Sequence, residues 1–158
     1  MPLLRDLLMD LGYTNVTTYL QSGNAVFRVA RRTPARLERE IGDALARSLG
    51  FEVPVLVRSR SEIAHLIERN PLVRLGREGA RLQVTFLEKR PDPAAVKDLR
   101  PVDHTPDEFS LGEREVYLWC PNGVLASRLP MELWDKRFGL TTTRNWNTIL
   151  ALGELFGL

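Results

Sequence analysis

The chain has 158 residues, 44% of them hydrophobic, so it can bury a core of ordinary size as one compact domain or as two small packed halves. Its 22 basic and 20 acidic residues leave a net charge of +2, too small for a dedicated binder of duplex nucleic acid. Cys120 is the single cysteine, which excludes an intrachain disulfide, and the absence of an export signal or a long apolar run predicts a cytoplasmic protein without a membrane segment.

The first elements in chain order are an amphipathic helix and a β-hairpin. Residues 2–11 place five leucines on one helical stripe, and Gly12 follows as a left-handed stop. Two β-rich runs, 16–20 and 25–29, flank the polar loop 21–24, whose length and glycine are typical of a hairpin.

A second helix and a short strand follow the hairpin. Thr33 and Pro34 predict the start of a helix that Gly50 closes, because a hydroxyl caps the first turn and proline tolerates it. Residues 53–58 predict a strand, with Pro54 at its start or on a sheet edge because proline cannot donate to a ladder. The pattern Ser59-Arg60-Ser61-Glu62 is a capping box and predicts a helix that ends at Asn70.

The rest of the chain predicts four more strands and three more helices. Strands are expected at 82–87, and at 108–111 and 115–120 as a second hairpin, with a brief strand at 140–143. Helices are expected at 91–99 and 130–138 and at the C-terminus after Thr148.

The predicted order of elements repeats along the chain. It indicates an α+β protein made of two fused ferredoxin-like plaits of the βαββαβ type, the first lacking its leading strand. We expect the first half to span residues 1–58 and the second to span residues 59–158 with the C-terminal helix.

The main candidate site is the stretch Thr141–Thr148, which leads into the last helix. It carries six hydroxyl or amide side chains, one guanidinium and one indole where a helix offers free N–H groups. We expect a small anionic or polar ligand to bind there, with these residues as its contacts: Thr143, Arg144, Asn145, Trp146 and Asn147. Thr142 belongs to the same pocket, which uses Arg144 as a planar fork.

A structural interpretation of the same stretch stands beside the binding one. Asn145 or Thr143 would cap the helix, Trp146 would pack between the halves, and Arg144 would pair with a carboxylate.

The loop of the first hairpin supplies a second polar cluster. Gln21, Ser22 and Asn24 are further expected ligand contacts, provided that the loop lies near Arg144. The alternative is ordinary turn chemistry, since glycine and asparagine fit a positive φ.

No catalytic residue, metal site or cofactor is predicted. His65 and His104 lack further ligands at metal spacing, and Cys120 shares a strand face with apolar residues, which predicts a buried thiol. The sequence contains no recognised catalytic motif, such as a Ser-His-Asp order, and it leaves open whether the protein is an enzyme.

Two other functions remain as alternatives. Tyr19, Phe27, Tyr117 and Trp119 lie on the hairpins, as aromatic residues do in plaits that stack single-stranded RNA bases, but the specific RNA-binding signature is absent. The other alternative is a structural or interaction protein that forms a homodimer and binds no ligand.

Four motifs resemble one known family over nearly the whole chain. They are Tyr-Leu-Gln-Ser-Gly-Asn-Ala-Val-Phe at 19–27, Phe-Glu-Val-Pro-Val at 51–55, Val-Thr-Phe-Leu at 84–87 and Thr-Thr-Arg-Asn-Trp-Asn-Thr at 142–148. They are similar to the uncharacterised bacterial family labelled domain of unknown function 1697. The resemblance implies a duplicated α+β plait in a small cytoplasmic protein and carries no established activity, substrate or catalytic residue.

The sequence departs from the family pattern at its start. The resemblance implies a leading strand and a Gly-rich loop before the first helix, and nothing here corresponds to them. In a βαββαβ plait this strand is central, so its absence would leave unpaired edges inside the sheet. We expect a start upstream of residue 1, a re-paired sheet, or a strand supplied in trans, for example by a homodimer.

Overall fold

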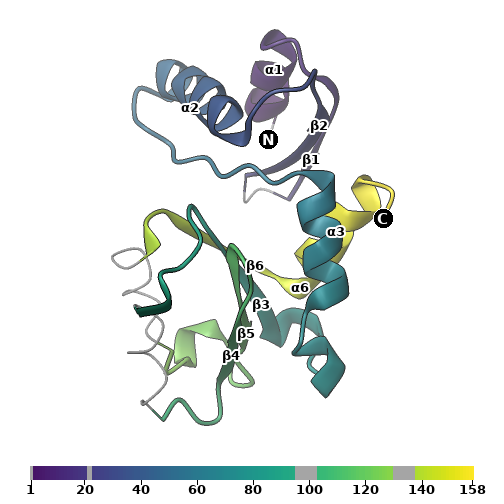
Figure 1. Ribbon diagram of the computed structural model, residues 1–158. Coiled ribbons are helices and arrows are strands. Elements are labelled where there is room, and N and C mark those ends of the chain that lie inside the picture. The colour runs from purple at the N-terminus through teal and green to yellow at the C-terminus, as the bar shows by residue number, and fades with distance from the viewer. Residues whose placement is uncertain (1, 21–22, 95–102, 130–137) are drawn as a thin grey trace. The chain divides into compact units, whose positions relative to one another are not determined.

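The computed structural model describes residues 2–20, 23–94, 103–129 and 138–158 (Figure 1). The chain divides into two compact units, one made of Met1–Ala64 with Leu152–Leu158 and the other of His65–Ala151. The predicted helix at 130–138 and most of the one at 91–99 lie outside the described residues. Among the helices that the structure describes, none has the length and apolar character needed to cross a membrane.

The first unit contains two helices and the predicted hairpin. Helix α1 (Pro2–Asp10) is followed by strands β1 (Thr14–Tyr19) and β2 (Asn24–Arg28), which pair antiparallel, and by helix α2 (Pro34–Leu49). The caps of α2 are those that the sequence predicts. The Thr33 side chain accepts from the backbone N–H of Arg36 at 3.4 Å, and Gly50 ends the helix at φ 81°.

The core of the first unit lies between the two helices and the hairpin. Leu8 is almost fully buried. The other core residues are hydrophobic and recur at the spacing of a helix or a strand. They are Leu7, Tyr13, Leu37, Ile41, Ala44 and Leu45, with the alternate residues Ala25, Phe27 and Val29 packed against them.

The strand predicted at Val53–Arg58 is not formed as a paired strand. Val53, Val55 and Val57 pack against the core of the first unit, but the segment belongs to neither of the two sheets in the described residues. Pro54 removes one ladder donor, and the backbone N–H of Val57 donates to Glu38 Oε1 at 2.9 Å. The prediction was wrong because apolar alternation indicates which face is buried, whereas a ladder also needs a neighbouring strand.

The second unit is built on a four-stranded antiparallel sheet. Its strands are β3 (Leu82–Leu87), β4 (Glu108–Leu111), β5 (Glu115–Trp119) and β6 (Thr141–Asn145), in the spatial order β4-β5-β3-β6. Every residue of β3 is buried, because this central strand is paired on both edges and both faces of the sheet are covered. The described residues thus form a mixed α/β structure with two small antiparallel sheets.

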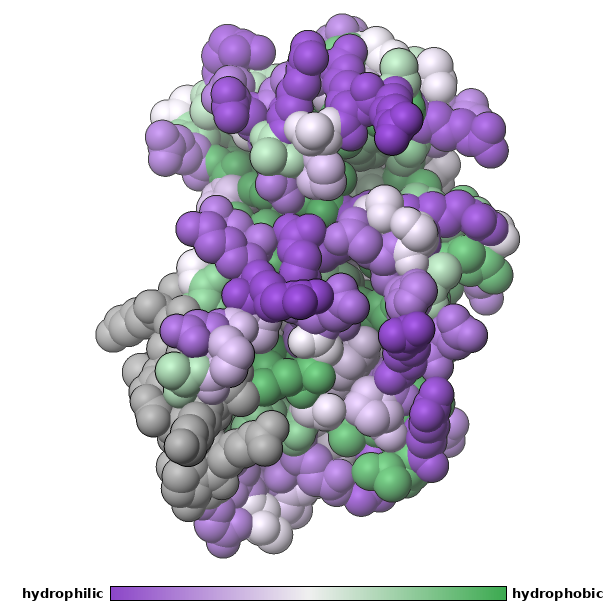
Figure 2. Space-filling view, viewed as in Figure 1, coloured by the Kyte–Doolittle hydropathy of each residue, from purple (hydrophilic) through white to green (hydrophobic). Residues whose placement is uncertain are grey.

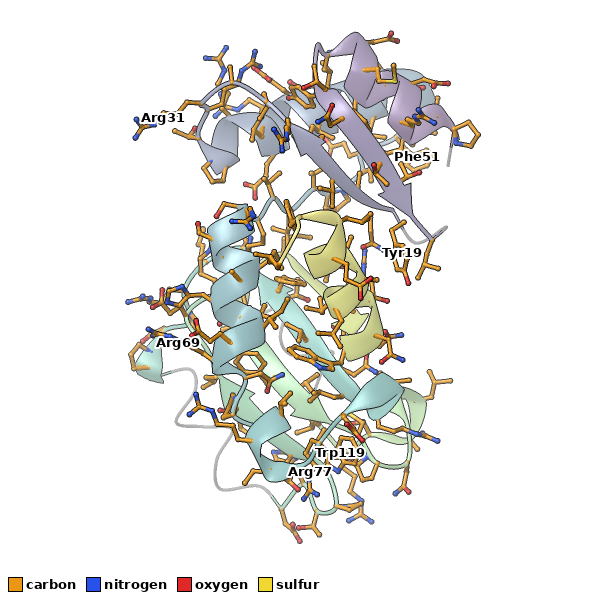
Figure 3. All side chains as sticks on the ribbon, turned by 90° about the vertical axis from the view of Figure 1, so that its right-hand side faces the viewer. Tyr19, Arg31, Phe51, Arg69, Arg77 and Trp119 are labelled. Atoms are coloured by element: carbon orange, nitrogen blue, oxygen red, sulfur yellow. The ribbon has the colours of Figure 1, made fainter. Side chains whose placement is uncertain are left out.

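Two helices cover one face of this sheet, and an apolar core covers the other. Helices α3 (Arg60–Arg69) and α6 (Trp146–Leu155) lie over the same face in both ribbon views (Figures 1 and 3), and the boundary between the units falls within each of them. The opposite face carries a core whose members are Leu87, Val116, Leu118, Cys120, Leu129 and Phe138.

Hydrophilic side chains cover most of the face shown in Figure 2, and the hydrophobic ones between them form small, separate areas. The largest fully buried side chains of the described residues include Leu8, Leu82, Leu87, Leu118 and Ile149, all of them apolar.

The buried Tyr13 of the first unit donates to Glu40, a carboxylate that interacts with three side chains. Tyr13 stacks on Phe27 with ring centroids 4.7 Å apart, and its hydroxyl donates to Glu40 Oε2 at 3.0 Å. Arg36 Nε donates to Glu40 Oε1 at 2.9 Å, and Arg32 pairs with the same carboxylate. The hydrogen bond from Arg36, assisted by those from Tyr13 and Arg32, holds the pKa of Glu40 below its ordinary value.

The substitution Glu40→Gln tests this arrangement. Because the pKa of Glu40 is lower in the folded chain than in the unfolded chain, its stabilising effect is complete above the ordinary glutamate pKa of about 4.3 and disappears in acid. We expect Glu40→Gln to lower the thermal midpoint at pH 7, with the difference from wild type shrinking as the pH falls below about 4. Thermal unfolding followed by circular dichroism at several pH values measures this. The exposed Glu52, changed to Gln, is the control, and an equal loss there would contradict the assignment.

Candidate functional site

The predicted binding stretch lies on a strand and on the first turn of a helix. Strand β6 ends at Asn145 and α6 begins at Trp146, so Arg144 belongs to the sheet and faces Val84 of β3 in the register. The sequence prediction placed this arginine in a polar segment ahead of the helix. The strand extends further because the edge of β3 offers a complete row of backbone partners for residues 141–145.

The guanidinium of Arg144 is held against its own strand. Its Nη1 donates to Thr142 Oγ1 at 2.7 Å and to the backbone oxygen of Thr143 at 2.8 Å. Thr142 and Arg144 are two residues apart on one strand and so share a face of the sheet. The side chain is half-buried, and this burial lowers the pKa of Arg144 from its ordinary value because the charged form loses hydration. The site therefore contains a positively charged group that is partly removed from water.

Asn145 has a structural role at the start of α6. Its Oδ1 accepts from the backbone N–H of Thr148 at 2.9 Å and from the Thr148 hydroxyl at 3.0 Å. This is the geometry of an N-cap, in which a side-chain oxygen satisfies a donor of the first turn. The structural interpretation of Asn145 is thus observed directly.

The remaining residues of the stretch differ in exposure and direction. Trp146 is 5% exposed, so its indole packs inside the protein, while the neighbouring Asn147 is exposed at the first turn of α6. Thr143 bonds to Thr85 through their hydroxyls at 2.7 Å, on the sheet face opposite Arg144. The predicted contacts therefore do not all point to one side of the sheet.

The second predicted cluster is described only in part. Gln21 and Ser22 lie outside the described residues. Asn24 is 8% exposed, and its Nδ2 donates to the backbone oxygen of Tyr19 at 3.2 Å across the hairpin. This loop belongs to the first unit and Arg144 to the second.

A stacked ion pair in the second unit was not predicted from the sequence. Arg77 and Trp119 lie together (Figure 3), with the guanidinium carbon of Arg77 5.4 Å from the centroid of the Trp119 ring. Arg77 Nη2 also donates to Glu108 Oε1 at 2.6 Å. Glu108 and Trp119 are direct cross-strand partners of β4 and β5. Predicting this cluster would require the register of the two strands, which the sequence does not determine. The indole of Trp119 is thereby covered by a cation of the same chain.

A buried carboxylate organises the loop after β5 and was also missed. Asp107 is 7% exposed and accepts from the Ser127 hydroxyl at 3.1 Å and from the backbone N–H of Arg128 at 2.6 Å. Cys120 Sγ lies 3.7 Å from Ser127 Oγ, and burial raises the pKa of this thiol. A thiol with a raised pKa is a poor nucleophile, in agreement with its place in the core.

A surface hollow lies in the first unit, apart from the predicted contacts. Pro2, Arg5, Asp6 and Thr18 line it, and its two charged side chains have opposite sign. None of these residues was predicted as a ligand contact, and the hollow does not add to the site around Arg144.

Comparisons with known proteins agree on a family and a fold. A family model described as "Protein of unknown function (DUF1697)" matches residues 1–117. The solved structure of the conserved bacterial protein SP0830 from Streptococcus pneumoniae has a TM-score of 0.71 and 20% sequence identity, and the alignment covers 99% of this chain and 88% of that chain. This likeness concerns the fold alone. No curated protein matches the sequence.

Two substitutions distinguish the capping role of Asn145 from the exposed amide of Asn147. We expect Asn145→Ala to lower the free energy of unfolding by about 1 kcal/mol, because the backbone N–H of Thr148 loses its acceptor. The matched control is Asn147→Ala, which removes an exposed amide and should change stability by less than about 0.5 kcal/mol. Urea unfolding measures both, and equal losses would contradict the assignment of Asn145 as the cap.

Proposed function

We propose that this chain, which belongs to the DUF1697 family of proteins of unknown function, binds a small anionic or polar ligand beside Arg144. The observation that carries the proposal is the half-buried guanidinium on β6, whose pKa is lowered by burial. Among the contacts that the sequence predicts, Arg144 is the anchor. No reaction is assigned to the site.

The electrostatics of Arg144 support an anionic ligand. Removing a charged group from water costs free energy, and an anion nearby offsets part of that cost because Coulomb attraction is stronger where water is excluded. Two hydrogen bonds from Nη1, to Thr142 Oγ1 and to the backbone oxygen of Thr143, hold the guanidinium of Arg144 on its own strand. A planar guanidinium has five N–H donors, and a carboxylate or phosphate group matches its fork geometry.

The start of α6 supports the same class of ligand. This helix has ten residues and begins immediately after β6, and the positive end of its dipole favours negative charge. Asn145 satisfies one N–H of the first turn, and the buried Trp146 fixes the position of that turn. In this proposal Asn145 and Trp146 shape the site, while Arg144 and the exposed Asn147 are the groups that contact the ligand.

The aromatic side chains give little support to single-stranded nucleic acid as the ligand. Tyr117 is 3% exposed, Phe27 is stacked on Tyr13, and Trp119 lies beneath the guanidinium of Arg77. Base stacking needs an accessible aromatic face. A small molecule is therefore preferred to a nucleic-acid strand.

We also propose that the chain is a duplicated ferredoxin-like protein with halves at 1–58 and 59–158. A βαββαβ chain whose first strand is central has the spatial strand order 2-3-1-4, and the order β4-β5-β3-β6 of the second unit agrees with it. In the first half β1 and β2 would correspond to β4 and β5, and residues 53–57 to β6.

A thermal-shift screen tests the ligand proposal. Inorganic phosphate and a panel of mono- and dicarboxylates are added to the full chain, and a ligand at 100 times its Kd should stabilise the folded state by about 2.7 kcal/mol. We expect at least one anion to raise the thermal midpoint, and Arg144→Lys to weaken its binding about tenfold or more, since lysine keeps the charge but lacks the fork.

The matched control for this screen is Arg74→Lys, which alters an exposed arginine in the same unit. It should leave the shift unchanged. Equal loss in both variants, or no anion that stabilises the wild-type chain through Arg144, would overturn the proposal.

A further inference from the structure

We infer that Arg77 and Trp119 form a second binding site, which takes the carboxylate group of a small molecule in exchange for the carboxylate of Glu108. This site does not depend on the one proposed beside Arg144. Glu108 lies on β4 and Arg144 on β6, at opposite edges of the four-stranded sheet, with β5 and β3 between them.

The guanidinium of Arg77 is positioned by contacts that do not involve a ligand. Its carbon lies 5.4 Å from the centroid of the Trp119 ring, and Figure 3 shows the two side chains together. The backbone N–H of Arg77 donates to the backbone oxygen of Leu72 at 3.1 Å, which holds the loop that carries the side chain. An arginine that is already stacked on an indole loses little further freedom when it binds an anion.

The hydrogen-bonding edge of this guanidinium is only half used. In any guanidinium the N–H of Nε and one N–H of Nη2 point the same way and match the two oxygens of a carboxylate. Arg77 Nη2 donates to Glu108 Oε1 at 2.6 Å, whereas Nε is buried and has no acceptor among the described residues. Glu108 thus occupies one half of an edge that fits a whole carboxylate group.

Glu108 is a partner that another carboxylate can replace. Its backbone lies directly across from Trp119 in the ladder of β4 and β5, so its side chain approaches Arg77 from a fixed position. The side chains of Arg77 and Glu108 are 36% and 37% exposed, and an ion pair with this much access to water adds little stability. A carboxylate on a free molecule can place its two oxygens on Nε and Nη2 together. The exchange satisfies the buried donor and turns one charged hydrogen bond into two.

A second buried donor in the same loop indicates the same class of ligand. Asn70 is 1% exposed, and its Oδ1 accepts from the backbone N–H of Leu72 at 3.0 Å, while its Nδ2 has no acceptor in the part of the chain that the structure describes. Buried donors without an acceptor are rare in native proteins. Both unsatisfied groups of this loop are donors, so an anion with oxygen atoms fits it and a metal cation does not. Glu108 already presents a carboxylate to Arg77, which favours a carboxylate over a phosphate group.

The NMR signals of the arginine Nε–H groups test the site. The full chain, both wild type and with Arg144→Lys to remove the other proposed fork, is titrated with acetate, benzoate and inorganic phosphate. We expect a saturable shift of the Arg77 Nε signal with a carboxylate in both chains, because the buried donor gains an acceptor. Adding Arg77→Lys should weaken binding of that carboxylate about tenfold or more, since lysine keeps the charge but lacks the edge.

The substitution Glu108→Gln gives a result in the opposite direction. It removes the competing carboxylate, so the same ligand should bind about threefold more tightly than in the parent chain. The matched control is Glu78→Gln, which removes an equal charge from an exposed position next to Arg77 in the chain. This control should leave the affinity unchanged.

Three outcomes would overturn the inference. The first is equal tightening by Glu108→Gln and Glu78→Gln, because the effect would then come from net charge. The second is the absence of a saturable Arg77 shift in both the parent chain and Glu108→Gln, and the third is a shift with phosphate alone. Failure of the Arg144 proposal would change none of these readings, since the Arg77 signal is followed with and without Arg144.

Discussion

The pairing of β3 on both of its edges is the constraint on which the second unit depends. Its residues bond to β5 on one side and to β6 on the other, so segments about thirty and sixty positions further along the chain are brought into one sheet. Because side chains alternate along β6, this register fixes Arg144 on one face and Thr143 and Asn145 on the other. The position of the candidate ligand contact is therefore a consequence of sheet register and of the early start of α6.

In the first unit, neither of the two strands that the structure describes is paired on both edges. Its hairpin and helices form a core around Leu8 and Ile41, and Val53, Val55 and Val57 pack against that core. In the described residues the backbone N–H of Val57 donates to Glu38 and its backbone oxygen accepts from Arg58.

Local patterns in the sequence were sufficient for most of the described elements. The capping box at Ser59 and Glu62 is formed, with the Ser59 N–H donating to Glu62 Oε2 at 2.8 Å, and Thr33 and Gly50 limit α2 as their chemistry requires. These signals succeed because caps and turns involve neighbours in the chain. The strand at 53–58 failed, and the length of β6 was underestimated, because ladder formation depends on a distant partner.

The candidate site was predicted in composition but not in geometry. The cap by Asn145 and the burial of Trp146 were among the alternatives that the sequence left open, and only coordinates distinguish them. The Arg77, Glu108 and Trp119 cluster depends on three segments and had no local signal. Register, long-range ion pairs and side-chain direction are tertiary properties, which explains why these features could not be derived from residue order.

The most direct test of the central claim is the side-chain NMR signal of the Arg144 guanidinium during titration with anions. The account predicts a saturable shift of the Arg144 Nε resonance with one class of anion, while the resonance of Arg36, which is already paired with Glu40, stays constant. A shift of the same size at every exposed arginine, or none at Arg144, would contradict it.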